Sequence, residues 1–198
     1  LFPVANSIVQ AAVNTMGTDT IAAWGICDKL DMLIWLLADA MGPALTTYTA
    51  QNMGAGRWDR VCKGNRIGAA MSVAAVGTVS LGLYFLTAPL GGLFVPVQDA
   101  AAVVPQAVAF MRRMAPFFLF YALAESFSGA CCGTGDTVRP MILTLLSICL
   151  LRVLGILLVL PRQHTMECII DIYISSWIAA GIGFLILWQW EKNRVQKT

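Results

Sequence analysis

Carboxylates inside long apolar stretches are the residues of this sequence that could do chemistry. Asp39 and Glu125 each lie in a strongly apolar segment, and Tyr121 precedes Glu125 by one helical turn. Ionisable side chains are costly inside a bilayer, so each is a functional candidate. Lining an aqueous cavity between helices, they would bind cations or protons. A purely structural role is equally open for Asp39 and Glu125.

The remaining ionisable groups in apolar segments favour a structural role. They can reach the membrane interface or pair with one another, as expected for Asp28, Lys29, Arg112, Arg113 and Asp171. Arg152 lies deeper and could be the partner of an acid.

No arrangement typical of an enzyme or a metal site is visible. The single His164 has no second ligand nearby, and the six cysteines show no metal-binding spacing. We find no Ser/His/Asp or Cys/His arrangement for nucleophilic catalysis. The sequence therefore predicts neither catalysis nor a metal centre.

Composition indicates that these residues are carried by membrane-spanning helices. Of the chain, 58% is hydrophobic and only 12% charged, and mean hydropathy is +0.73. Residues 67–97 form 31 positions without a charge, longer than the roughly 30 Å hydrocarbon core requires. We therefore expect an all-α integral membrane protein. The net charge of +2 gives no argument for nucleic acid as a partner.

Six helical segments are predicted from the apolar runs and the Gly and Pro residues between them. Their approximate bounds are 1–16, 20–49, 63–89, 100–132, 140–160 and 166–190. The first is about 24 Å long by helical rise, which is short of a full span. It carries amides on one helical face, which we expect to line the same cavity: Asn6, Gln10 and Asn14. In the fourth segment, Pro105 and Pro116 predict kinks.

The glycine-rich, basic run at residues 51–60 (QNMGAGRWDR) predicts a turn between two spans. Loops on its side of the membrane and the C-terminal tail carry eight basic residues, including Lys197, and the opposite loops carry one, Arg162. This bias places the run and the C-terminus in the cytoplasm, with the protein in the cell membrane.

Small residues at every fourth position of the third segment predict close approach of a neighbouring helix. This stripe consists of Ala70, Ala74, Thr78 and Gly82.

Three stretches together resemble the C-terminal half of a multidrug and toxic compound extrusion (MATE) transporter. They are residues 13–17 (VNTMG) leading to 21–23, residues 51–60, and residues 133–137 (GTGDT) with Pro140. The resemblance implies twelve helices in two lobes around a central cavity. Residues 1–198 would form the second lobe, with Leu1 inside a truncated seventh helix.

The resemblance further implies a secondary antiporter that exports organic cations or drugs in exchange for Na⁺ or H⁺. Besides that coupling ion no cofactor is expected. The expected partners are the lipid bilayer, an N-terminal lobe and small organic cations. Tyr121 stands where Na⁺-coupled members have an aspartate on the tenth helix, and Glu125 follows one turn later. By itself, this chain is expected not to transport, because half of the cavity would be missing.

Two alternatives remain open. One is a flippase for a lipid-linked glycan, which an interior rich in Arg and Lys would favour. The other is a membrane scaffold that does not transport. An enzyme is the class with least support.

Overall fold

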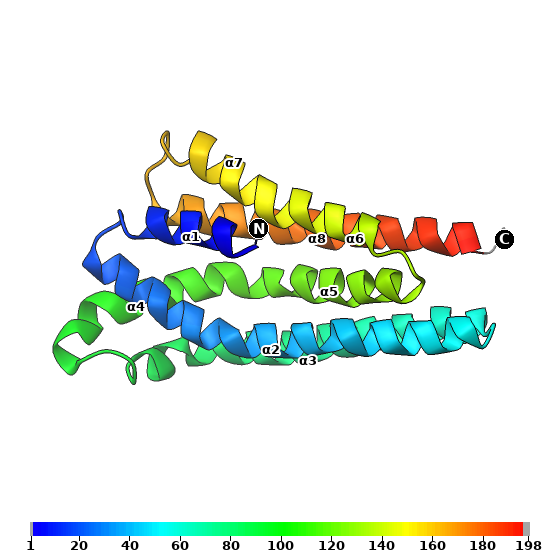
Figure 1. Cartoon of the computed structure of the whole chain (residues 1–198). Helices are drawn as coiled ribbons and strands as arrows, with labels where there is room; N and C mark the ends of the chain where they lie inside the picture. Colours follow the sequence, from blue (N-terminus) through cyan, green and yellow to red (C-terminus); the bar gives the residue numbers. More distant parts are fainter. Residues whose placement is uncertain (1, 196–198) are drawn as a thin grey trace.

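The computed structural model describes residues 2–195, which form a bundle of helices without β-strands (Figure 1). Leu1 was predicted to lie inside a truncated helix, and Lys197 was counted among the basic residues of the C-terminal tail. Both residues lie outside the described part of the chain. The elements are α1 (Phe2–Val13), α2 (Thr18–Gly54), α3 (Trp58–Gly91), α4 (Val97–Met114), the 3-10 turn η1 (Ala115–Phe117), α5 (Phe118–Gly133), α6 (Val138–Thr144), the π-helical turn η2 (Leu145–Leu150), α7 (Leu151–Leu158) and α8 (Met166–Val195).

Four continuous helical stretches have the length and hydropathy to cross a membrane. They are Trp58–Gly91, Val97–Gly133, Val138–Leu158 and Met166–Val195. The all-α membrane class is therefore confirmed. In the described part of the chain, α1 has 12 residues and is too short for this criterion, whereas α2 is long but carries acids along its length.

The six segments appear in the predicted order, but several helices extend further than expected. The second predicted segment ended at residue 49, whereas α2 continues to Gly54. The third began at residue 63, whereas α3 begins at Trp58. The connection is therefore only three residues long, and Gly56 adopts φ 68° within it. Helices persist beyond the apolar run because polar residues can continue the backbone ladder once nucleated.

Two predicted segments contain interruptions. Pro116 lies in η1, which separates α4 from α5, as its missing N–H predicts. α4 continues through Pro105. Between α6 and α7, η2 widens the helix by a π turn, which the sequence did not predict.

α5 lies at the centre of the bundle. Figure 1 shows it between α2 and α3 on one side and α7 and α8 on the other, and it contacts α2, α3 and α8. Large side chains with almost no exposure fill the space around it: Phe118, Trp177, Ile34 and Met111. Side chains on α5 are therefore held by packing on several sides.

Backbone contacts at glycines bring α5 close to its neighbours. A Cβ on Gly129 would overlap the backbone of Gly42 on α2, and one on Gly181 of α8 would lie 2.8 Å from the Phe120 carbonyl oxygen. The hydroxyl of Thr46 lies 3.0 Å from the Gly42 carbonyl and 2.9 Å from the Gly129 carbonyl, which share its one hydrogen. Small residues thus permit the closest helix contacts, as in other membrane bundles.

The small-residue stripe on α3 does not face a neighbouring helix in the described chain. Ala70, Ala74 and Thr78 are exposed, and a Cβ on Gly82 would meet nothing within 4 Å. No helix within residues 2–195 packs closely there. The prediction of a close helix neighbour is therefore wrong for the described chain, where α5 carries the close contacts instead.

Candidate functional site

One face of α5 and one face of α2 meet along their length. The facing α5 residues recur at every fourth position: Tyr121, Glu125, Gly129 and Gly133. The facing α2 residues recur every three or four positions: Asp39, Gly42, Thr46 and Thr49. Small residues at one half bring the backbones together, and the polar side chains at the other half therefore lie opposite each other.

Asp39, Tyr121 and Glu125 form a cluster at this contact. The Tyr121 hydroxyl donates to Asp39 Oδ1 at 2.7 Å. Glu125 Oε2 lies 3.5 Å from the Cβ position of Gly42, and its carboxyl interacts electrostatically with that of Asp39. Tyr121 is buried, Glu125 is half-buried and Asp39 is exposed. The cluster therefore has a fixed inner side and an accessible outer side.

A proline in α2 interrupts the backbone hydrogen bonds next to this cluster. Pro43 lies inside the helix and has no N–H, so the Asp39 carbonyl receives no hydrogen bond from position 43. Freed carbonyls in membrane helices serve as ligands for small cations. The cluster itself offers the oxygens of two carboxylates and a phenol. In residues 2–195 no three His, Cys, Asp or Glu side chains are grouped to hold a metal ion.

Behind the cluster, Trp35 lies between Asp31 and Tyr121. Its indole N–H donates to Asp31 Oδ1 at 3.0 Å, and its ring lies edge-on to Tyr121 with centroids 4.4 Å apart. Asp31 is only 6% exposed. The site predicted from the sequence did not include Trp35 and Asp31, although the regular spacing of Asp31, Trp35 and Asp39, four residues from each to the next, was the available signal.

Arg152 on α7 is a buried cation close to this region. Its Nε donates to Ser176 at 3.0 Å, its guanidinium lies over the Tyr173 ring at 3.9 Å, and it is 2% exposed. Its Nη2 has no acceptor within residues 2–195, so the structure does not give it the acidic partner that its depth suggested. The π turn just before it adds a residue to one turn, which rotates the side chains that follow.

The amides predicted on the first helix lie apart from the cluster. Gln10 donates to Asn14 at 3.0 Å, and Asn6, Gln10 and Asn14 are all exposed. Within the described chain, none of them bonds to Asp39, Tyr121 or Glu125. The structure therefore brings together three of the six predicted cavity residues, and the role of all six stays a prediction.

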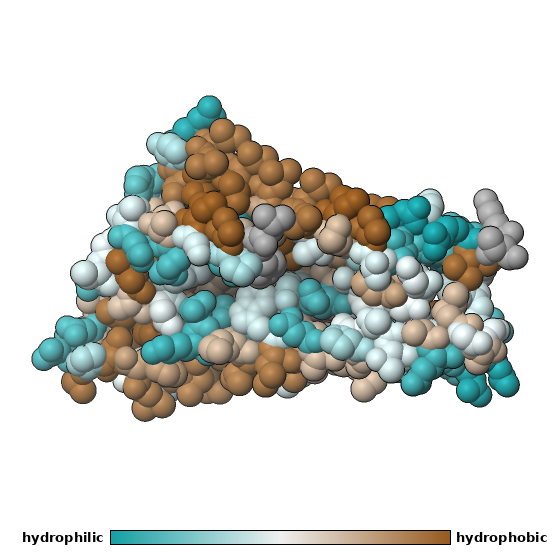
Figure 2. Space-filling model, in the orientation of Figure 1, coloured by the Kyte–Doolittle hydropathy of each residue, from teal (hydrophilic) through white to brown (hydrophobic). Residues whose placement is uncertain are grey.

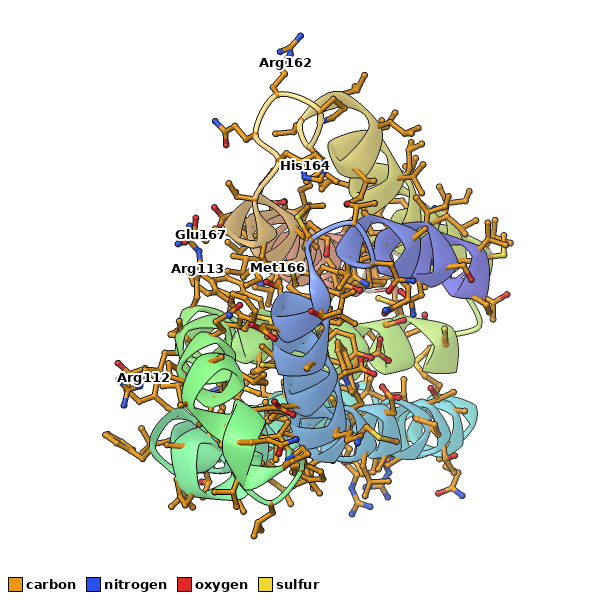
Figure 3. The ribbon with its side chains drawn as sticks, turned by 90° about the vertical axis from the view of Figure 1, so that its left-hand side faces the viewer. Arg112, Arg113, Arg162, His164, Met166 and Glu167 are labelled. Carbon is orange, nitrogen blue, oxygen red and sulfur yellow. The ribbon has the colours of Figure 1, made fainter. Side chains whose placement is uncertain are left out.

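The charges assigned a structural role lie largely at the end opposite the α2–α3 connection. Figure 3 views that end and shows Arg112, Arg113 and Arg162 on its outer surface. Arg113 forms an ion pair with Asp171 at 2.7 Å, with both side chains about half exposed (46% and 54%). Such exposed pairs contribute little stability. Lys29 lies 5.1 Å from the Phe94 ring centroid.

At the α2–α3 connection end, four charged residues form a network. Arg139 pairs with Asp136 at 2.9 Å and with Glu191 at 3.3 Å, and Arg194 pairs with Glu191 at 2.8 Å. Burial acts to raise the pKa of Asp136, but hydrogen bonds from the backbone amide and the guanidinium of Arg139, together with the Arg139 charge, lower it overall. The network ties α6 to the end of α8.

Hydropathy separates the surfaces of the bundle. Figure 2 shows hydrophilic and neutral residues in the middle of the face over α1, α2 and α5, with apolar residues over α7 and along the lower edge. Together with the four spanning stretches, these features define a multi-pass α-helical membrane protein with acids at an interior helix contact.

The chain belongs to the MatE family, because a sequence model of that family matches residues 1–158. It is also similar to the protein named "Probable multidrug resistance protein YoeA" of Bacillus subtilis (strain 168), with 20% identity over 194 residues. That match covers 96% of this chain and 41% of the relative, so the chain spans less than half of the relative's length. The resemblance to MATE transporters is thereby confirmed, and such transporters are in general not enzymes.

Proposed function

We propose that this chain forms the C-terminal lobe of an antiporter that exports organic cations in exchange for Na⁺ or H⁺. The observation that carries the proposal is the cluster of Asp39, Tyr121 and Glu125 at the α2–α5 contact. Membership of the MatE family and similarity to a protein named for multidrug resistance support it.

The cluster has the chemistry that exchange of cations requires. Two ionised carboxylates close together repel each other, and a cation held between them relieves that repulsion. A cation already bound there leaves less negative charge for a second one. An exported organic cation and a coupling Na⁺ or H⁺ would therefore compete for the same negative charge.

Burial makes the electrostatic competition effective. Tyr121 is 5% exposed and holds Asp39 from the interior, whereas Asp39 is exposed on the opposite side. In a partly dry site, charges interact more strongly than in bulk water. We infer that an N-terminal lobe covers the accessible side of Asp39 and completes the cavity.

Charge distribution supports a cytoplasmic position for the α2–α3 connection. The basic residues at that end of the described chain are Arg57, Arg60, Lys63, Arg66, Arg139, Lys192 and Arg194. The opposite end carries Lys29, Arg112, Arg113 and Arg162, of which Arg113 is paired with Asp171. The excess at the first end favours the cytoplasmic side, with the protein in the cell membrane.

Efflux of a fluorescent organic cation by the full-length protein tests the proposal. We expect Asp39→Asn and Glu125→Gln each to slow efflux at least tenfold, which corresponds to about 1.4 kcal/mol. Asp28→Asn is the matched control, because Asp28 is an exposed acid on the same helix. Wild-type efflux rates in both cluster variants, at equal expression, would refute the assignment.

A flippase for a lipid-linked glycan is the second candidate, favoured by one observation. Arg152 is a buried cation whose Nη2 lacks an acceptor in the described chain, and an anionic cargo could supply one. In that case Arg152→Gln, and not Asp39→Asn, would abolish transport, and organic cations would not be exported. A scaffold would transport neither the organic cation nor the lipid-linked glycan.

A further inference from the structure

A groove with a volume of about 920 Å³ opens on the bundle away from the candidate site. α3 and α8 form its walls, and Leu123 and Phe127 of α5 form its floor. It exists because α3 and α8 both pack on α5 while their outer parts stay apart.

One end of the groove is strongly basic. Lys63 and Arg66 of α3 and Lys192 of α8 line it, together with a single acid, Asp59. Three positive charges and one negative charge leave a net charge of +2 there. None of the three cations has a salt-bridge partner within residues 2–195. This end therefore attracts an anion that the described chain does not provide.

Below the basic end the lining is apolar. It includes Ile67, Val73 and Leu185, and Ala70 adds depth because its side chain is small. Ile67 is 50% and Leu185 is 37% exposed. From Lys63 to Val73, ten residues of helix rise about 15 Å. That length is about half of the hydrocarbon core, so the groove runs through one leaflet.

Trp58 adds an unsatisfied hydrogen-bond donor at the basic end. Its ring lies 6.2 Å from that of Trp188, it lines the groove, and its indole Nε1 is buried without an acceptor in the described chain. Tryptophan favours the level of lipid headgroups, where its ring is apolar and its N–H can donate. Trp58 therefore indicates that the basic end of the groove lies at the level of the headgroups.

A second groove of about 430 Å³, between α6, η2 and α8, shows why the basic end matters. Arg139 lies at its end but is already paired with Asp136 and Glu191. Of these two grooves, only the one between α3 and α8 combines an apolar channel with cations that form no salt bridge in the described chain. Basic pockets between membrane helices are typical sites for anionic lipid headgroups.

We propose that the α3–α8 groove binds one anionic phospholipid from the leaflet next to the α2–α3 connection. The lipid phosphate lies among Lys63, Arg66 and Lys192, and an acyl chain follows the apolar channel past Ala70. This site is separate from the acids at the α2–α5 contact, and it does not depend on the proposed transport activity.

Native mass spectrometry of the full-length protein in detergent tests the proposal with phosphatidylglycerol and phosphatidylethanolamine of identical acyl chains. We expect tighter binding of phosphatidylglycerol by the wild type. Lys63→Gln/Arg66→Gln lowers that affinity about 25-fold, at about fivefold for each basic residue, and Lys192→Gln lowers it about fivefold. The matched control, Arg57→Gln/Arg60→Gln, removes the same charge from the adjacent turn and changes affinity less than twofold.

A second pair of variants distinguishes a lipid from a free anion. Ala70→Phe fills the channel and weakens phosphatidylglycerol binding, whereas Ala75→Phe, at an exposed position of the same helix, does not. Equal binding of the two lipids by the wild type would overturn the proposal. So would equal effects of the two double variants, or inorganic phosphate displacing the lipid while Ala70→Phe leaves binding unchanged.

Discussion

Replacing Gly129 by alanine tests whether backbone contact between α2 and α5 positions the acidic cluster. A Cβ at this position would overlap the carbonyl carbon, oxygen and Cα of Gly42, which are backbone atoms and cannot move like a side-chain end. Overpacking of this kind costs about 1–3 kcal/mol. The helices must separate, and the Tyr121–Asp39 hydrogen bond must lengthen or break.

Gly82→Ala is the matched control. Gly82 is also a helical glycine, but a Cβ there would meet nothing within 4 Å. Alanine at such a position should stabilise the helix by about 0.5–1 kcal/mol. The two variants should therefore differ by about 1.5–4 kcal/mol in the free energy of unfolding, measured by thermal or denaturant unfolding of the full-length protein in detergent. Equal stability of the two variants would refute the argument that backbone contact holds α2 against α5.

Three further predictions follow from the described contacts. Gly155→Ala should destabilise the protein less than Gly129→Ala, because the atoms nearest its Cβ belong to the Ile172 side chain, at 2.8 Å, and not to a backbone; the same unfolding measurement checks this. Trp35→Phe leaves the 6%-exposed Asp31 without its indole donor and should cost about 1–3 kcal/mol; a variant as stable as wild type would contradict it. Asp136→Asn should destabilise the protein at neutral pH. The pKa of Asp136 is lowered in the folded protein, so its carboxylate stabilises the fold above the unfolded pKa of about 3.9, and this contribution is lost on acidification. The free energy of unfolding measured against pH should therefore show the difference between variant and wild type shrinking below about pH 4.

Much of the fold could be predicted from the sequence because bilayer thickness and breaker residues constrain it directly. Gly56 marked the α2–α3 connection and Pro116 the break between α4 and α5, and both lie where predicted. Helix ends were less predictable, since α2 and α3 extend into polar residues that carry no hydropathy signal. The π turn at Leu145–Leu150 has neither glycine nor proline to mark it.

The candidate site was predicted in part for a related reason. Asp39 and Glu125 were found because acids in apolar segments are rare, and Tyr121 because of its spacing from Glu125. Their meeting across two helices required knowledge of which helices touch, which no single segment contains. The small residues gave a misleading signal on α3, whereas the same spacing on α5, at Gly129 and Gly133, marks the actual contact.

The architecture of α5 limits how the proposed exchange can work. Gly129 fixes one end of the α2–α5 contact by backbone touching backbone, and Tyr121 fixes Asp39 from the buried side by a 2.7 Å hydrogen bond. The inner side of the cluster therefore has little freedom to open, because close-packed backbones cannot slide without losing these contacts. Access of ions to Asp39 must then change on its exposed side. It follows that alternation between the two faces of the membrane depends on movement of whatever covers Asp39 relative to an α2–α5 pair that moves as one unit.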